Sequence, residues 1–182
     1  MALLLAEGFI RSGRGRPFPT SRAVASTSFV EALRQAREDP RVRAIVLRVD
    51  SPGGSGLASD LIWREIRLAR EKKPLVVSMG DLAASGGYYL AMGADWIVAE
   101  PATLTGSIGV IAGKVNLRGL YDLLGLSKET IDRGERAGAL SDYRAFTDAE
   151  RRRLEEDIHA TYEDFVAKAA SCRGLSVEEI DK

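Results

Sequence analysis

Short apolar stretches alternate with longer amphipathic stretches along most of the chain. The runs at residues 42–49, 74–79 and 96–100 are rich in β-branched residues and have few polar interruptions, which is typical of buried parallel strands. The opening run, MALLLAEGFI, predicts a further strand. It is too short to cross a bilayer and lacks the basic start and cleavage site of a signal peptide.

Between and after these runs, apolar residues recur with helical spacing. The segments with this spacing are residues 26–38, 57–73, 116–125 and 148–173. In the second segment the expected inner face consists of Leu61, Ile62, Ile66 and Ala69. The last segment opens with Thr147 and Glu150 in the spacing of a capping box. Strands that alternate with helices predict βαβ units and an α/β fold.

The amino-acid composition is that of a soluble globular protein. A chain of 182 residues with 45% hydrophobic and 29% charged residues has the make-up of one soluble globular domain, so residues 1–182 are interpreted as a single domain. The 26 basic and 26 acidic residues balance, which gives no general affinity for nucleic acid. One cysteine, Cys172, excludes an internal disulfide. A capping box at Ser176 opens a final helix of barely a turn, so we expect a piece of a longer polypeptide.

Two glycine-bearing turns follow predicted strands. The first is RVDSPGGSG (48–56), with Gly53 and Gly54, and the second is GDLAASGGYY (80–89), where Ser85 is flanked by small residues. Ligands of parallel α/β sheets bind beyond the carboxyl ends of strands. Backbone N–H groups in such turns can stabilise a developing oxyanion. The turns therefore predict a serine nucleophile beside an oxyanion hole, with plain strand-to-helix turns as the alternative.

The sequence does not supply an evident general base for this serine. The one histidine, His159, lies in an acidic helical stretch, LEEDIHATYEDF, and is interpreted as a solvated side chain. A serine–lysine dyad is the other route. Of the six lysines, only Lys114 lies in a plausible loop, and Lys128 is expected to start a short strand.

The glycine turns lie in longer motifs that resemble one family. The stretches LRVDSPGGSGLASDLI, KPLVVSMGDLAASGGYYLAMGADWIVAEPATLTGSIGVI and YEDFVAKAA are similar to the signal peptide peptidase A (protease IV) family of membrane-bound Ser–Lys proteases. The resemblance covers about residues 3–182 and implies a Clp protease/crotonase-like α/β spiral.

The resemblance also implies roles for individual residues. Ser85 is the expected nucleophile. The N–H of Gly86 and one from the Gly53–Gly54 pair form the expected oxyanion hole, and Ser107 of TGSIG orients the lysine base. Neither a metal nor a cofactor is implied. An extended substrate would add as a strand beside the turns, with small apolar pockets suited to leader-peptide remnants.

The chain departs from this family at the base. Single-domain members carry the lysine in a Gly-x-x-Lys motif after TGSIG, and here Gly134 is followed by Ala137 at the lysine position. An alanine cannot accept a proton. Tandem-domain members complete the site with a lysine from their N-terminal domain, so this chain is interpreted as the C-terminal half of such a protein. An engineered Lys→Ala change and a naturally inactive relative are the alternatives.

The expected function is therefore a serine endopeptidase domain that degrades cleaved signal peptides and is inactive as an isolated chain. The expected partners are peptides, a lysine-bearing N-terminal domain of the same protein and further copies in a homo-oligomer. The family implies a location at the cell membrane, with the anchor outside this chain and the protease domain outside the cytoplasm. The alternatives are a non-catalytic oligomerisation domain and a crotonase-like acyl-CoA enzyme.

Overall fold

In the computed structural model, which describes residues 1–15 and 23–181, the chain divides into two units. One unit contains residues 1–109 and 165–182, and the other contains residues 110–164. The larger unit carries Ser85 and both glycine turns. A single domain over the whole chain stays a prediction.

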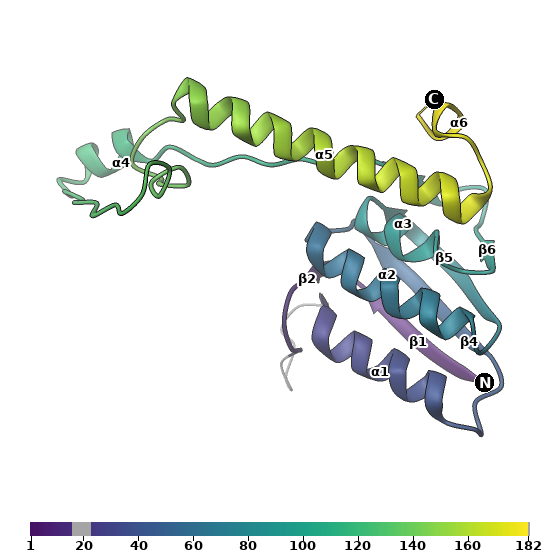
Figure 1. Ribbon diagram of the computed structural model, residues 1–182. Coiled ribbons are helices and arrows are strands. Elements are labelled where there is room, and N and C mark those ends of the chain that lie inside the picture. Colours follow the sequence, from purple (N-terminus) through teal and green to yellow (C-terminus); the bar gives the residue numbers. More distant parts are fainter. Residues whose placement is uncertain (16–22, 182) are drawn as a thin grey trace. The chain divides into compact units, whose positions relative to one another are not determined.

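A parallel sheet forms the centre of the larger unit (Figure 1). Its strands, in spatial order, are β1 (Ala2–Glu7), β4 (Ile45–Ser51), β5 (Leu75–Ala84) and β6 (Trp96–Val98). A further short strand, β7 (Leu104–Gly106), pairs in parallel with the last residues of β5. Every pairing in the sheet is parallel, which confirms the predicted α/β class.

In the described part of the chain, three helices pack against this sheet. They are α1 (Ser26–Glu38), α2 (Gly56–Arg70) and the short α3 (Gly86–Ala91). Figure 1 shows α1 and α2 side by side across the sheet. The core that they enclose is mostly aliphatic, and its fully buried members include Leu33, Ile45, Leu47, Ile62, Ile66, Leu75 and Leu90. The prediction for Leu61 was wrong: the residue is 45% exposed, because the buried face of α2 runs through Ile62, Ile66 and Ala69.

Two of the predicted strands are longer than expected at the end where the site lies. β4 continues to Ser51, two residues beyond the predicted end, and β5 continues to Ala84, five residues beyond it. The extension of β5 arises because Leu82–Ala84 pairs with β7, a strand that the sequence analysis did not predict. Ser85 therefore follows the last residue of a strand directly.

A second, small sheet lies next to the first glycine turn. Its strands, β2 (Phe9–Arg11) and β3 (Ala23–Ala25), are parallel. Ile10 of β2 forms an isolated parallel bridge with Gly54. Its N–H donates to Gly53 O at 2.8 Å, and its carbonyl accepts from Ser55 N at 2.9 Å. These bonds hold the glycine turn by its backbone.

The smaller unit contains α4 (Arg118–Leu123) and the first part of the long helix α5 (Asp148–Arg173). Lys128 lies outside any strand, so the predicted short strand there was wrong. The final helix of the chain, α6 (Val177–Ile180), belongs to the larger unit and begins with the predicted capping box at Ser176. In the part of the chain that the structure describes, no helix is both long and apolar enough to pass through a membrane.

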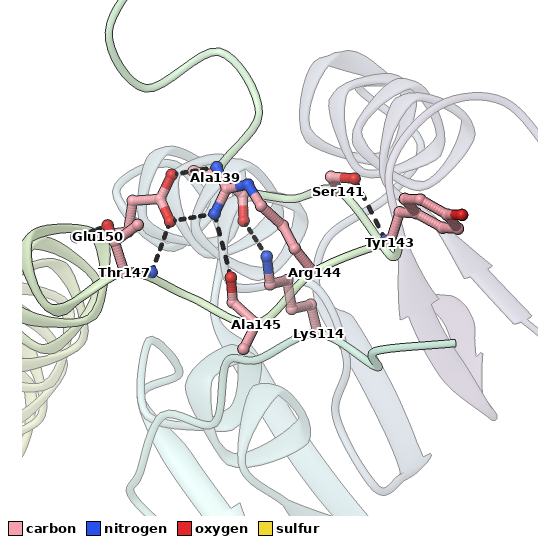
Figure 2. A network of polar contacts seen from close by, with 8 residues as sticks. All are labelled: Lys114, Ala139, Ser141, Tyr143, Arg144, Ala145, Thr147 and Glu150. Atoms are coloured by element: carbon pink, nitrogen blue, oxygen red, sulfur yellow. Dashed lines mark hydrogen bonds and ion pairs between the residues drawn. The ribbon is translucent and has the colours of Figure 1, made fainter. Parts of the chain in front are cut away.

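The start of α5 is fixed by the predicted capping box and by an ion pair. Glu150 N donates to Thr147 Oγ1 at 3.3 Å, and Thr147 N donates to Glu150 Oε2 at 2.9 Å. Two guanidinium nitrogens of Arg144 donate to the carboxylate oxygens of Glu150 at 2.6 and 2.7 Å (Figure 2). Because Arg144 and the Thr147 N–H both favour the charged form, they lower the pKa of Glu150 to about 2.

Candidate active site

Ser85 lies at the junction between β5 and α3 in a strained backbone conformation. Its φ is 50° and its ψ is −116°, a combination that costs free energy for a residue with a side chain. Two hydrogen bonds hold it: Ser85 N donates to Gly106 O at 2.8 Å, and Ser85 O accepts from Tyr89 N at 2.9 Å. Strain that the surrounding structure maintains is common at catalytic residues. The side chain of Ser85 is half-buried.

The structure brings the two glycine turns together. A Cβ atom placed on Gly53 would lie 2.5 Å from Gly86 N and 2.9 Å from Ser85 Cβ. One placed on Gly86 would lie 3.1 Å from Gly53 Cα. The absence of side chains at Gly53 and Gly86 is therefore what lets the first turn pack directly against Ser85. Residues predicted on two separate turns form one cluster.

Within the Gly53–Gly54 pair, hydrogen bonding separates the two N–H groups. Gly53 is buried, and its N–H donates to Ser51 Oγ at 3.1 Å. Gly54 is exposed, and within the described residues its N–H has no hydrogen-bond acceptor. Gly86 is the first residue of α3, where N–H groups have no partner inside the helix. The geometry thus favours the N–H groups of Gly54 and Gly86 as donors to an oxyanion.

A side chain at Gly54 should disrupt this turn. The φ of Gly54 is 148°, and an added Cβ would lie 2.1 Å from Ile10 O, which belongs to the backbone and cannot move aside cheaply. We expect Gly54→Ala to lower the free energy of unfolding by about 2 kcal/mol or more, from backbone strain and the lost bridge to β2. Urea unfolding followed by circular dichroism measures this.

Gly56→Ala is the matched control. Gly56 begins α2, has no positive φ, and has no atom within 4 Å of an added Cβ. Alanine there should leave stability unchanged or raise it slightly. Equal stability of the Gly54→Ala and Gly56→Ala variants would contradict the tight packing of the turn.

Ser107 lies next to Ser85 through the pairing of β5 with β7. Ala84 is paired with Gly106, so Ser85 and Ser107 each follow one member of that pair. Both serines have a φ of 50°. Ser107 is exposed. Strand pairing thus places Ser107 of TGSIG beside the candidate nucleophile.

The residues considered as general bases for Ser85 either interact with other residues, are exposed, or have no group that can accept a proton. Ala137 is exposed in a turn of the smaller unit, where its N–H donates to Gly134 O at 3.3 Å. Lys114 Nζ donates to Ala139 O at 2.7 Å (Figure 2) and lies 4.3 Å from the centre of the Phe146 ring. The side chain of His159 is 79% exposed on α5. Among the described residues, no lysine or histidine forms a hydrogen bond with Ser85 Oγ.

A polar cluster one helical turn beyond Ser85 was not predicted. Lys168 Nζ lies 2.7 Å from Asp60 Oδ1 and 3.1 Å from the hydroxyl of Tyr89, which itself donates to Asp60 Oδ1 at 3.0 Å. Burial raises the pKa of Tyr89. The cluster joins α5, α2 and α3. Its members are more than 100 residues apart at the extremes, so no local pattern could have shown it.

Over residues 1–15 and 23–181, no three His, Cys, Asp or Glu side chains are placed to hold a metal ion.

Comparisons with known proteins agree with the resemblance in the sequence. The pattern of peptidase family S49 matches residues 67–182. The chloroplastic serine protease SPPA of Arabidopsis thaliana is 42% identical over the whole of this chain and 27% of its own length. Protease 4 of Salmonella typhi is 37% identical over the whole chain and 29% of its own length. The chain thus spans between a quarter and a third of these relatives.

A solved structure supports the fold. A ClpP1 mutant from Listeria monocytogenes matches with a TM-score of 0.50 over 98% of this chain and 76% of its own, at 14% sequence identity. At this identity the match concerns the fold alone, and it confirms the predicted Clp protease-like architecture. With the family pattern covering more than half of the sequence, the chain belongs to peptidase family S49, the family of the signal peptide peptidase A proteases.

Proposed function

We propose that this chain is a serine endopeptidase domain in which Ser85 is the nucleophile and the N–H groups of Gly54 and Gly86 form the oxyanion hole. The observation that carries this proposal is the approach of the Gly53–Gly54 turn to Ser85 and Gly86, which only glycine permits. A serine on a strained strand-to-helix junction, beside N–H groups that have no acceptor in the described part of the chain, is the arrangement that acyl transfer requires.

In the proposed reaction, Ser85 Oγ attacks the carbonyl carbon of a peptide bond while a neutral lysine removes the hydroxyl proton. The carbonyl electrons move to oxygen, where the N–H groups of Gly54 and Gly86 stabilise the charge. The lysine then gives its proton to the leaving amine, and the peptide remains as an acyl ester of Ser85. Water, deprotonated by the same lysine, hydrolyses the ester.

The lysine is proposed to come from another domain of the same protein. Ala137 stands where the family motif after Gly134 has its lysine, and Lys114 is held by Ala139 and Phe146 within the smaller unit. The two relatives named above are more than three times as long as this chain, which leaves room for such a domain in them. Ser107, next to Ser85 in register, would orient the incoming amine.

The substrates proposed are cleaved signal peptides rich in leucine and alanine, bound as an extended strand with their side chains in small apolar pockets. A lysine-bearing N-terminal domain and further copies of the chain are the proposed protein partners. A location at the cell membrane, with the anchor outside this chain and the protease domain outside the cytoplasm, is proposed from the family as well.

Intact mass after treatment with a fluorophosphonate tests this function. We expect little adduct on the chain alone and a single adduct on Ser85 when a lysine-bearing domain of the family is added. Rapid labelling of the chain alone would show a base within these 182 residues. No adduct under either condition would contradict catalysis and favour a non-catalytic assembly domain.

A further inference from the structure

Ser51 is buried at the point where the two halves of the candidate site meet. It is the last residue of β4, it is 0% exposed, and it pairs with Ala83 of β5, two residues before Ser85. The register between β4 and β5 shifts between Val49 and Ser51. A buried hydroxyl is costly unless its hydrogen bonds are satisfied, so the partners of Ser51 show what it does.

The hydroxyl of Ser51 forms two hydrogen bonds, one as a donor and one as an acceptor. Its single hydrogen is donated to Gly8 O at 2.7 Å, and its oxygen accepts from Gly53 N at 3.1 Å. Gly8 is itself fixed, because its N–H donates to Asp50 O at 2.9 Å. Since a serine hydroxyl has only one hydrogen, the bond to Gly8 directs the oxygen lone pairs toward Gly53. The hydroxyl thus holds the Gly53 N–H, while the N–H of Gly54 has no acceptor among the described residues.

Ser51 also contacts the other side of the site. A Cβ placed on Gly87, the second residue of α3, would lie 2.6 Å from Ser51 O and 3.4 Å from Ser51 Cβ. The first turn of α3 therefore packs directly on Ser51. One residue consequently sets the orientation of the Gly53–Gly54 turn and supports the helix that begins with Gly86.

We propose that Ser51 is a positioning residue for the oxyanion hole: its hydroxyl fixes the Gly53–Gly54 turn so that the Gly54 N–H, together with that of Gly86, faces the carbonyl oxygen of a substrate. This inference rests on the proposed function. Ser51 does not touch the reacting atoms, and its effect is transmitted through Gly53.

A peptide aldehyde tests the inference without the missing lysine. The Ser85 Oγ–carbon bond of the hemiacetal forms as the carbonyl π bond breaks, and the hydroxyl proton is carried by water to the former carbonyl oxygen. The equilibrium of hemiacetal formation therefore needs no general base. The former carbonyl oxygen of the aldehyde nevertheless occupies the proposed oxyanion hole. The ligands are acetyl-Leu-Leu-alaninal and the matched alcohol, which makes the same strand contacts and cannot form the hemiacetal. Calorimetry gives both affinities.

The ratio of aldehyde to alcohol affinity is the readout. We expect Ser51→Ala to lower this ratio about 10-fold, less than the 10²–10³ typical of losing an oxyanion donor outright, while the alcohol binds as before. Cysteine has a similar shape to serine, but its sulfur is a weaker acceptor. The affinity ratio of Ser51→Cys should therefore lie between those of the unaltered chain and Ser51→Ala. Ser26→Ala is the matched control, because Ser26 is 2% exposed and its Oγ likewise accepts from a glycine N–H, that of Gly13 at 3.3 Å.

The possible outcomes are distinct. An unchanged ratio in Ser51→Ala, or an equal fall in Ser26→Ala, overturns the positioning role. A parallel loss of alcohol affinity shows general damage to the fold and overturns it as well. If the unaltered chain shows no preference for the aldehyde, or if Ser85→Ala keeps the preference, the proposed function itself fails and the inference fails with it.

Discussion

Replacing Ser85 with alanine should lower the hydrolysis of leucine- and alanine-rich peptides by at least ~10³-fold, because no other group can form the acyl ester. The measurement is cleavage of a fluorogenic peptide by the chain combined with a lysine-bearing domain of the family. Alanine removes one hydroxyl oxygen atom and leaves the hydrogen bonds of the Ser85 backbone to Gly106 and Tyr89 in place. The thermal midpoint should therefore stay close to that of the unaltered chain.

Ser107→Ala is the comparison for this variant. Ser107 has the same φ of 50° and follows the residue that pairs with Ala84, so both substitutions act on equivalent backbone. We expect Ser107→Ala to lose less activity than Ser85→Ala, since it orients the base and forms no bond to substrate. Residual cleavage in Ser85→Ala equal to that of the unaltered chain would refute the assignment of the nucleophile.

A lysine at position 137 should greatly increase the reactivity of Ser85. General-base catalysis typically contributes 10²–10⁴-fold, so we expect Ala137→Lys to raise the rate of fluorophosphonate labelling of Ser85 in the chain alone by ~10²-fold or more. Ala137 is exposed in a turn that begins at Gly134, whose φ is 109°. A longer side chain can be added there at little cost to stability. The labelling rate should rise with pH as the new amine loses its proton.

Ala137→Met is the matched control, because methionine gives an unbranched side chain of similar length without an amine. It should label as slowly as the unaltered chain. Ser85 of Ala137→Lys could also react slowly with the fluorophosphonate while a separate lysine-bearing domain speeds the reaction. In that case the base comes from that domain, and a lysine at position 137 cannot replace it. If Ala137→Met labels as fast as Ala137→Lys, the gain is not due to a base.

Much of the fold was predicted from the sequence because its signals are local. The helical spacing in residues 26–38 and 148–173 corresponds to α1 and α5, and the predicted capping box at Thr147 forms. The apolar runs became the parallel strands of the sheet. The ends of the strands were predicted less well. The last residues of β5 are strand because β7 pairs with them, and that pairing joins segments about 20 residues apart.

The candidate site was predicted in part. Ser85 and the glycine pair stood out because small residues cluster beside each of them, and the family motifs gave them roles. The sequence alone left open which glycine donates. Ser51 was passed over, although it begins the SPGG turn, because its importance lies in bonds to Gly8 and Gly53 and in the packing of Gly87. Such contacts depend on how two strand ends meet.

The sequence by itself determined the α/β class, the nucleophile candidate and the family, because each is carried by residue type and short-range spacing. Only the tertiary structure decided that Gly53 packs against Ser85 and Gly86, that Gly53 rather than Gly54 donates its N–H to Ser51, and that Ser107 lies beside Ser85. The physical reason is that strand pairing and close backbone packing bring together atoms far apart along the chain. Their hydrogen bonds then fix which N–H groups remain available for chemistry.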